Sequence, residues 1–558
     1  MANLGGYFAQ HLGTPEKALY RHFEAERWTD IAVGELALLI GRWQAALRNR
    51  GLSAGDRIAV CLRNGINWVA VDLAALGLGI VVVPVYVDDN PDNVAWCVAN
   101  AEAKLLVVET SKMAEALRKT GAALPPICVL RPDSDETSPS VASLLPAAAD
   151  APTFLALPDS ALATICYTSG TSGRPKGVML SHGNIIANVR SCRETAMARP
   201  TDVFLSILPM SHMFERTGGY YFPLSLGAKV VYARGIAQIA EDLASQSPTV
   251  MFAVPRVFER FKARVDQALS ESALKRWLFQ QCTTRGWRHA QRRGGPLDAL
   301  AVWALRPVVG KPILARLGGR MRLAVVGGAA LDPDIAHTFI GLGLPMLQGY
   351  GTTEASPVIS VNRDKDNDPD SVGPPLPGVE VKIGDGSELL ARGGNVMLGY
   401  WRNEEATRAS VDAEGWLHTG DIAEIRDNRI YIRGRLKDIL VMSNGEKLPP
   451  QDAEFAVLHD SVFEQVMLVG EGRPFLTLVA VTQEADESLL IERANERLKA
   501  FPRWVRVRRV IATREPWSIE NGLLTPTLKL KRPLVFARFK DAIDALYTEE
   551  SERRSVAA

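Results

Sequence analysis

The sequence predicts an α/β protein with a large N-terminal domain of layered α/β sheets, a small antiparallel barrel-like sheet, and a small α+β C-terminal domain. Short apolar runs alternate with helix-like segments between residues 29 and 349, which is typical of parallel α/β layers. Residues 380–435 contain stretches with a two-residue period, such as VEVKI and RIYIRG, which favour a small antiparallel sheet. Fresh strands and helices follow Arg435, enough for a separate small domain.

The alternation gives the expected elements in chain order. A helix is predicted over residues 31–50, and a surface connection rich in Pro, Ser and Asp over residues 131–158. Buried strands are predicted from short apolar runs. They fall at residues 57–62, 79–87, 105–109, 127–130, 161–166, 203–209, 229–232, 249–254, 322–327 and 345–349, and in the C-terminal domain at 466–469 and 475–481.

Composition limits the classes of function. The 558 residues are 47% hydrophobic and carry a formal net charge of +1, so there is room for several cores and no overall argument for a nucleic-acid partner. Six scattered cysteines without a C-x-x-C pair indicate reduced thiols in a cytoplasmic protein, with no zinc site. No basic segment followed by an apolar core opens the chain, so export is not expected.

The most apolar tract, residues 66–87, has two interpretations. A membrane span is one, but the tract contains Asn67, Asp72 and Pro84. We therefore expect a buried helix followed by a β-branched strand, IVVVPVYV.

A glycine-rich stretch, YTSGTSGRPKGV at residues 167–178, follows one of the expected strands. Its glycines allow backbone N–H groups to face an anion, its hydroxyls add donors, and Lys176 adds a positive charge. The alternative is an ordinary Gly/Ser turn. The stretch is not a Walker-type phosphate loop, because Pro175 replaces the glycine before the lysine and Gly177 replaces the hydroxyl that would hold magnesium.

Two further stretches follow expected strands. LPMSHMFER, residues 208–216, places His212 in a loop, where a lone histidine is usually structural. QGYGTTEASP, residues 348–357, puts Glu354 among hydroxyl groups, which suits a magnesium ion that keeps most of its waters and bridges phosphate oxygens. Its alternative is a helix start with Thr353 as cap.

Three stretches in the last third of the chain are ambiguous when taken singly. Asp421 of GWLHTGD could accept both hydroxyls of a ribose or could simply belong to a turn. GRLKD, residues 434–438, could be solvated surface, and LLTPTLKLKR, residues 523–532, could be a basic loop.

Taken together and in this order, from about residue 160 to residue 532, these motifs resemble those of the adenylate-forming superfamily. The spellings LPMSHMFER, VPRVFER, GGAAL, QGYGTTEASP and NGLLTPTLKLKR look most like the long-chain fatty acyl-CoA synthetase branch. The resemblance implies a ligase that joins a fatty acid to coenzyme A in two steps. The carboxylate first attacks the α-phosphate of ATP to give acyl-AMP and pyrophosphate, and the thiol of coenzyme A then displaces AMP. Neither step needs a protein nucleophile, so the protein positions the substrates and neutralises phosphate charge.

The resemblance also implies a role for each matching residue. The β- and γ-phosphates would be held by Thr168, Ser169, Gly170, Thr171, Gly173 and Lys176. The α-phosphate and Mg2+ would be held by Thr353 and Glu354, with Thr168 as a second metal ligand. The adenosine would contact Tyr350, the backbone at Gly328 and Ala329, Asp421 and Arg435. His212 would lie beside the acyl carboxylate, and Lys529 would bridge that carboxylate and the α-phosphate.

The implied domains are a large one at residues 1–434, a hinge at residues 435–438 that contains Lys437, and a small mobile one at residues 439–558. Two departures from the family pattern are present. The glycine loop reads TSGTSG instead of TSGTTG, a conservative change, and Leu528 precedes Lys529 where most of the superfamily has glycine. The second departure favours the long-chain branch.

Two other functions stay open. The first is a fatty acyl-AMP ligase that loads an acyl carrier protein, but such enzymes usually carry an insertion before the hinge, and residues 421–437 are compact. The second is a non-catalytic nucleotide-binding paralogue. The presence of Glu354, Asp421 and Lys529 argues against it.

An acyl tunnel would run beside Phe214, Tyr220, Tyr221 and Phe222, whose aromatic walls suit an apolar ligand, although these side chains would serve equally well as core.

Residues 270–322 have an unusual charge pattern. They carry eleven Lys and Arg against Glu271 and Asp298, with Trp277, Trp287 and Trp303 interleaved. Basic residues with tryptophan suit an anionic lipid surface, which predicts peripheral membrane binding. The alternative is a helical excursion of the large domain whose tryptophans are core and whose arginines are solvated or bind the phosphates of coenzyme A.

Overall fold

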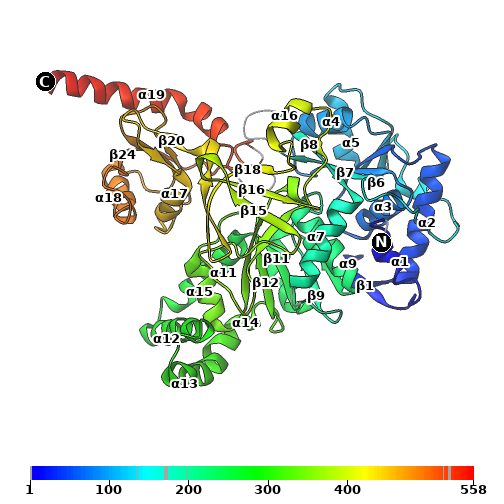
Figure 1. The fold of residues 1–558 in the computed structure, drawn as a ribbon, viewed down its shortest axis with the longest axis horizontal. Helices are drawn as coiled ribbons and strands as arrows, with labels where there is room; N and C mark the ends of the chain where they lie inside the picture. Colours follow the sequence, from blue (N-terminus) through cyan, green and yellow to red (C-terminus); the bar gives the residue numbers. More distant parts are fainter. Residues whose placement is uncertain are drawn as a thin grey trace.

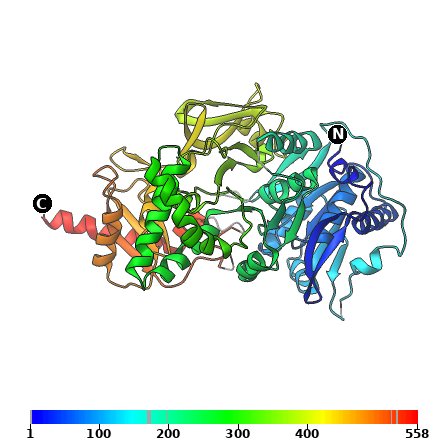
Figure 2. The same cartoon turned by 90° about the horizontal axis from the view of Figure 1, so that it is seen from below.

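The computed structural model describes residues 3–134, 136–168, 174–195, 198–519, 521–525 and 530–557. Two large sheets form the N-terminal part, a four-stranded sheet follows them, and a smaller α+β unit ends the chain (Figure 1). Figure 2 shows the four-stranded sheet on one side of the molecule, between the N-terminal sheets and the C-terminal unit. The α/β fold class predicted from the sequence is confirmed.

The first large sheet has seven strands, of which the five from β7 to the edge strand β6 are parallel. The strand order is β17-β8-β7-β4-β3-β5-β6, with β8 and β17 added antiparallel at one edge. The strands are β3 (Arg57–Cys61), β4 (Val81–Pro84), β5 (Leu105–Thr110), β6 (Ile127–Arg131), β7 (Leu162–Thr168), β8 (Lys176–Ser181) and β17 (Gly399–Tyr400). Most of their side chains are buried, as expected for parallel strands covered on both faces.

The apolar tract predicted as helix plus strand is α3 (Ile66–Gly77) followed by β4, and every residue of α3 except Asn67 is buried. None of the helices in the described chain is long and apolar enough to cross a membrane.

The second large sheet has eight strands in the order β14-β13-β12-β11-β9-β10-β1-β2. Strands from β13 to β1 run parallel, and β14 and β2 are antiparallel edges. The strands are β1 (Ala18–Glu24), β2 (Arg27–Ala32), β9 (Val203–Ser206), β10 (Lys229–Tyr232), β11 (Val250–Ala253), β12 (Leu323–Val326), β13 (Met346–Gly351) and β14 (Val358–Val361).

Helices connect and cover these strands (Figure 1). The helix expected at residues 31–50 is α2 (Val33–Asn49). Besides α3 and the helices at residues 213–226 described below, the first 250 residues contain α1 (Gly6–Ala9), α4 (Pro91–Asn100), α5 (Ser111–Lys119), α6 (Val141–Leu144), α7 (His182–Thr195), η2 (Ile236–Gln238) and α10 (Ile239–Gln246). Between residues 333 and 410 lie the helices α15 (Pro333–Leu342), η4 (Thr353–Ala355), η5 (Asp385–Ser387) and α16 (Glu404–Ser410).

A long helical excursion separates β11 from β12. It contains α11 (Pro255–Leu269), α12 (Ala273–Ala290), α13 (Pro296–Leu305), η3 (Arg306–Gly310) and α14 (Lys311–Ala315). In Figure 1, α12 and α13 form the lowest part of the molecule, a lobe that projects away from the sheets.

The four-stranded antiparallel sheet and the C-terminal unit follow. The sheet contains β15 (Val379–Ile383), β16 (Glu388–Gly393), β18 (Leu417–Arg426) and β19 (Arg429–Arg435). After η6 (Leu436–Asp438) come β20 (Leu440–Val441), β21 (Lys447–Leu448), α17 (Pro450–Leu458), β22 (Gln465–Val469), β23 (Leu476–Val481), α18 (Glu487–Arg497), β24 (Val507–Thr513) and α19 (Arg532–Ala557). The predicted hinge, residues 435–438, coincides with the end of β19 and with η6.

A buried ion pair joins the two large sheets. The motif LPMSHMFER continues through α8 (Met213–Glu215) into the π-helix η1 (Arg216–Tyr221) and α9 (Phe222–Leu226). Arg216, fully buried in η1, pairs with Asp72 of α3 and donates to the hydroxyl of Thr164 on β7 at 2.7 Å. The hydroxyls of Tyr220 and Tyr221 donate to the same Asp72 carboxylate at 3.1 and 2.9 Å.

We expect Arg216→Ala to lower stability by about 3 to 5 kcal/mol, because the substitution leaves Asp72 buried without its counter-charge. The matched control is Arg408→Ala, which breaks an exposed pair with Glu404 and should not change stability measurably. Melting temperature, followed by differential scanning fluorimetry, checks both. Equal shifts in the two variants would contradict the role of the buried pair.

Candidate active site

A cavity of about 2590 Å3 lies where the N-terminal sheets, the four-stranded sheet and the C-terminal unit meet. The ends of parallel strands border it, as is usual for ligand sites of α/β sheets. Of the sequence-predicted site residues, those that line it are His212, Gly328, Ala329, Tyr350, Asp421, Arg435 and Lys437.

Tyr350, Asp421 and Arg435 form one hydrogen-bonded chain across two sheets. Tyr350 is the last residue but one of β13, and its hydroxyl donates to Asp421 Oδ2 at 2.5 Å. Arg435 lies opposite Asp421 in the β18–β19 register and donates through Nε to Oδ1 at 2.7 Å. Each carboxylate oxygen of the buried Asp421 is therefore already oriented by a donor.

Burial raises the pKa of Tyr350 well above its ordinary value, and the neighbouring Asp421 charge raises it further. The Tyr350 hydroxyl thus keeps its proton at neutral pH and remains a donor to Asp421. The ring is fixed at the cavity wall by this bond.

The backbone after β12 approaches the cavity closely. Gly328 has φ of +81°, a conformation that favours glycine, and residues 328–330 are exposed to the cavity. A Cβ at Gly327 would come within 3.2 Å of both the Gly349 carbonyl oxygen and the Phe214 ring. This glycine pair lets a flat group approach the main chain beside Tyr350.

Glu354, four residues along the chain from Tyr350, forms a second cluster with Tyr400 and Lys176. The Tyr400 hydroxyl donates to Glu354 Oε1 at 2.8 Å, and the Thr352 hydroxyl contacts Glu354 Oε2. Lys176 Nζ lies over the Tyr400 ring, 5.0 Å from its centroid. Thr353 begins the short helix η4 that carries Glu354.

The glycine-rich stretch enters this cluster through its two ends. Thr168 at the end of β7 pairs with Lys176 at the start of β8. Ser169, Gly170, Thr171 and Gly173, which the sequence predicts as phosphate ligands, lie outside the described residues.

Tyr400 is a site residue that the sequence analysis missed. Backbone bonds fix its segment on both sides, from Trp401 N to the Gly177 oxygen at 2.7 Å and from Met397 N to the Glu354 oxygen at 2.8 Å. Its motif, LGYWRN, contains no charge pattern that separates it from an ordinary edge strand. Pairing with β8 is what brings it to Lys176.

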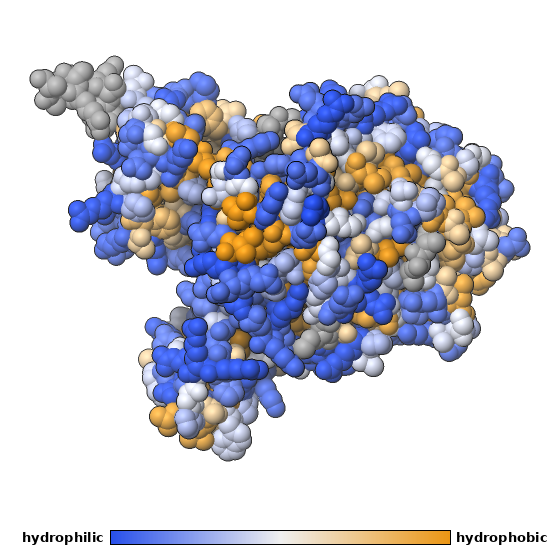
Figure 3. All heavy atoms as spheres, viewed as in Figure 1, coloured by the Kyte–Doolittle hydropathy of each residue, from blue (hydrophilic) through white to orange (hydrophobic). Residues whose placement is uncertain are grey.

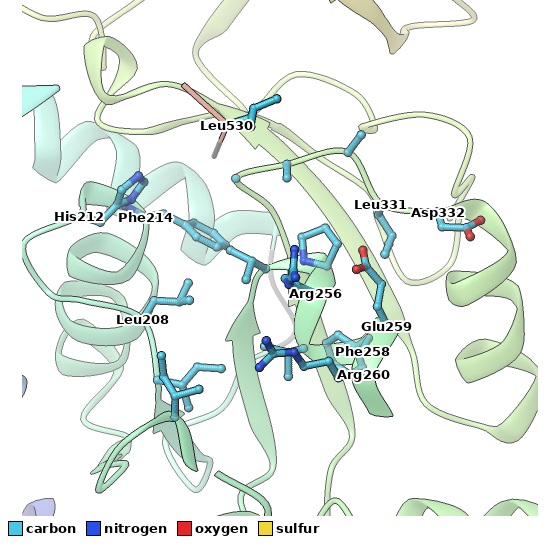
Figure 4. A pocket seen from close by; sticks show the side chains of 18 of the residues that line it. Leu208, His212, Phe214, Arg256, Phe258, Glu259, Arg260, Leu331, Asp332 and Leu530 are labelled. Atoms are coloured by element: carbon cyan, nitrogen blue, oxygen red, sulfur yellow. The ribbon is translucent and has the colours of Figure 1, made fainter. Parts of the chain in front are cut away.

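His212 lies at the start of α8, where its Nδ1 accepts from the backbone N–H of Phe214 at 3.2 Å. Figure 4 shows His212, Phe214 and Leu208 on one side of the cavity, with Leu530 above them. Asn64, which follows β3, holds this loop from the other sheet. Its side-chain amide donates to Ser206 Oγ at 3.0 Å and to the Leu208 oxygen at 2.6 Å, and its oxygen accepts from Met210 N at 2.8 Å.

The four aromatic residues proposed as an acyl wall divide into two groups. Phe214 lines the cavity. Tyr220, Tyr221 and Phe222 are fully buried in the core around the Asp72–Arg216 pair, so the tunnel interpretation is wrong for them and the core interpretation holds. Tyr220 and Tyr221 lie in the π-helix and turn toward Asp72 of α3, whereas Phe222 of α9 packs against Phe204 and Phe252.

The lysine predicted to bridge the substrates and the lysine predicted at the hinge differ in what the structure describes. Lys529 lies outside the described residues. Its neighbour Leu530 bridges to Leu524 and lines the same cavity as His212. Lys437 lies in η6, is exposed, and borders the cavity at the start of the C-terminal unit.

The fold and these clusters define an adenylate-forming enzyme, and comparison with known families agrees. Residues 8–401 match the model of the AMP-binding enzyme family, and residues 437–551 match that of the AMP-binding enzyme C-terminal domain. The chain belongs to this family, as predicted from the sequence, and within it to the long-chain acyl-CoA synthetase branch.

The relatives cover nearly the full chain. Long-chain-fatty-acid–CoA ligase FadD15 of Mycobacterium tuberculosis is 30% identical over 97% of this chain and 96% of its own length. Long chain acyl-CoA synthetase 7 of Arabidopsis thaliana, a peroxisomal protein, is 31% identical over 89% of this chain and 79% of its own.

Solved structures show the same fold. ATP-bound MatB from Rhodopseudomonas palustris superposes with a TM-score of 0.76 over 97% of this chain and 99% of its own, at 24% identity. The anthranilate CoA ligase AuaEII with anthranoyl-AMP superposes with the same score over 97% and 98%, at 19% identity.

A buried carboxyl group lies directly behind the His212 loop. Burial raises the pKa of Glu215 from an ordinary 4.5 to about 8, against the opposing influence of Ser206 and the Leu208 backbone. Gly219 makes room for it, since a Cβ there would be 2.2 Å from Glu215 Oε1. The native state therefore holds this proton more tightly than the unfolded chain does.

We predict that the free energy of unfolding falls as pH rises from about 4.5 to about 8. Protonated Glu215 stabilises the fold below its pKa in the unfolded chain, and this contribution is lost as pH rises toward its pKa in the folded protein. The loss is at most about 1.4 kcal/mol per pH unit. The melting temperature of Glu215→Gln should equal that of wild type near pH 5. It should exceed that of wild type by a growing margin as the pH rises toward 8. Glu405→Gln, at an exposed position, is the control. If the melting temperatures of wild type and Glu215→Gln change with pH by the same amount across this range, the prediction is contradicted.

Proposed function

We propose that this protein is an ATP-dependent long-chain fatty acid–CoA ligase. It forms acyl-AMP and pyrophosphate from ATP and a fatty acid, and then acyl-CoA and AMP from acyl-AMP and coenzyme A. The observation that carries the proposal is the convergence on one cavity of the Tyr350–Asp421–Arg435 chain, of His212, and of Leu530 from the C-terminal unit. Family membership and near-full-length ligase relatives support it.

In this proposal the adenosine lies against Tyr350, beside the exposed backbone of Gly328 and Ala329. Asp421 accepts the ribose hydroxyls, and Arg435 orients its carboxylate. These donors and acceptors are ordered before the nucleotide arrives, which reduces the entropy lost on binding.

The reacting groups meet between the second cluster and His212. Lys176 and the glycine loop hold the outer phosphates, Thr353 the α-phosphate, and His212 lies beside the acyl carboxylate. Lys529 bridges carboxylate and α-phosphate as the pentacovalent centre forms and pyrophosphate leaves. Positioning and charge neutralisation are the whole of the protein's contribution.

The residues around Glu354 fit a magnesium ion. No group of three or more His, Cys, Asp or Glu side chains arranged for a metal occurs among the described residues, so a dedicated protein cage is absent from that part of the chain. Mg2+ usually takes one or two carboxylates and completes its shell with water and phosphate oxygens. Glu354, oriented by the Tyr400 and Thr352 hydroxyls, and Thr168 would hold it. When bound, the ion neutralises phosphate charge.

Coenzyme A is the acceptor that the compact β18–β19 connection favours. Its turn is two residues, Asp427 and Asn428, both with positive φ (50° and 61°), so nothing is inserted before the proposed hinge. A carrier-protein ligase of Arabidopsis thaliana matches over 69% of this chain, against 97% for FadD15. We place the enzyme in the cytoplasm, in peripheral contact with a membrane.

Pyrophosphate release with a panel of carboxylic acids tests the activity. We expect release with long-chain acids, little with short or aromatic acids, and thioester only when coenzyme A is present. Lys529→Ala should lower adenylation at least a hundredfold and spare thioester formation from supplied acyl-AMP, whereas the nearby Lys531→Ala should keep both. Wild-type pyrophosphate release by Lys529→Ala would refute its assignment, and no release with any acid would refute the ligase.

Lys437→Pro tests the hinge. Proline fixes φ near −65° and hinders backbone rotation at the junction of β19 with the C-terminal unit. We expect adenylation to stay within about threefold of wild type and thioester formation to fall at least tenfold, with Lys437→Ala close to wild type in both. Equal losses in the two half-reactions would show that residue 437 is not the hinge.

A further inference from the structure

Helix α13 is an apolar helix without a buried residue. Its sequence, PLDALAVWAL, contains one charged residue, Asp298, and its last residue, Leu305, packs partly buried against the core. The exposed fractions are 71% for Leu297, 59% for Leu300 and 77% for Trp303. Large apolar side chains at such exposure are informative when they are contiguous.

These side chains follow one helical face. The positions 297, 300 and 303 are three apart, and exposed Val308 of η3 extends the row. The opposite face, with Ala301, Val302 and Leu305, is partly buried where α13 packs on α12. The exposed row is therefore an unpartnered apolar stripe at the outside of the lobe.

The first turn of α12 adds to this surface. Leu274 and Trp277 are also exposed, and they too lie three residues apart. Trp287, which the sequence analysis grouped with the other two tryptophans, stacks on His337 of α15 at 4.1 Å and packs against the core. The surface thus contains two tryptophans, and hydrophobic spheres gather at the tip of the lobe in Figure 3.

The segment that carries the stripe is rich in basic residues. Some of the eleven in residues 270–322 are engaged in the fold, as Arg285 with Asp298 at 3.6 Å, Arg306 with the carbonyls of residues 340 and 341, and Arg322 with Asp202. Others are exposed, namely Lys275, Arg276, Arg288, Arg292, Arg293, Lys311, Arg316 and Arg320.

We propose that α13, Val308 and the first turn of α12 form a membrane-docking surface that inserts its apolar stripe into an anionic bilayer. The stripe supplies apolar contact at the acyl boundary, tryptophans suit the interface, and the exposed cations face acidic headgroups. A second copy of the chain is the poorer occupant, because it would bring the same excess of positive charge to the contact. The inference rests on this surface and not on the proposed function. If the substrate is a fatty acid, which partitions into bilayers, docking would bring the enzyme to its substrate.

Cosedimentation with sucrose-loaded vesicles tests the surface. The wild type should bind phosphatidylglycerol–phosphatidylcholine vesicles at least tenfold more tightly than pure phosphatidylcholine vesicles, and less tightly at high salt. Leu300→Asp should lose at least tenfold in partition coefficient. Its matched control is Leu38→Asp on α2, at a comparable exposure of 66%, which should bind as wild type.

Two further measurements fix the geometry. Brominated lipids should quench part of the tryptophan fluorescence, and Trp303→Phe should remove much of that quenching. Arg292→Gln with Arg293→Gln should weaken binding to anionic vesicles but leave pyrophosphate release with dissolved acid unchanged. The binding measurements use neither ATP nor coenzyme A. A protein that binds vesicles but releases no pyrophosphate would refute the ligase proposal and leave the docking surface intact.

The proposal is overturned if the wild type shows no preference for anionic vesicles, or if Leu300→Asp and Leu38→Asp lose binding equally. It is also overturned if sedimentation velocity shows a dimer that Leu300→Asp dissociates while vesicle binding is absent, since the stripe would then be an interface between copies.

Discussion

The buried pair between Arg216 and Asp72 fixes the geometry on which the active site depends. Asp72 belongs to the first sheet's helix α3, Arg216 to the π-helix that follows His212, and Thr164, the third partner, to β7. Four residues beyond Thr164, β7 ends at Thr168, where the glycine-rich stretch begins. One guanidinium group therefore fixes the position of the His212 loop relative to the strand that leads into the glycine-rich stretch. A buried charge tolerates few alternative partners, which gives the junction its specificity.

Preorganisation extends from this junction to both polar clusters. Asp421 has a donor on each oxygen, and Glu354 has a hydroxyl partner on each of its own. Fixed dipoles and charges act on a substrate without reorganising at the moment of reaction, which is where their catalytic value lies. Asn64 has the same function for the His212 loop, since two of its three hydrogen bonds satisfy the backbone groups of Leu208 and Met210 and the third holds the Ser206 hydroxyl.

Most of the strand pattern could be predicted because buried parallel strands are apolar runs that chemistry alone identifies, as at Leu105–Thr110 and Lys229–Tyr232. The hairpin of β1 and β2 was missed, because its residues alternate too weakly against charged neighbours such as Arg21 and Asp30. Tyr400 and Asn64 could not be found from local pattern, since their roles come from contacts with residues 46 to 224 positions away. The π-helix was equally invisible, and with it the reason that Tyr220 and Tyr221 are core.

The near-neutral net charge of the chain conceals a strong local asymmetry, and the fold explains where the asymmetry is placed. Helix α11 begins at Pro255 beside the cavity, lines it as far as Asp266, and ends at Leu269 at the start of the basic lobe. Its 15 residues span about 22 Å, so one helix runs from the cavity wall to the lobe. The helix is itself basic where it borders the cavity, since Arg256, Arg260, Lys262 and Arg264 all line it. An anionic bilayer and a bound nucleotide both attract cations, so the proposed docking surface and the proposed ATP site need charge of the same sign, and α11 connects the two.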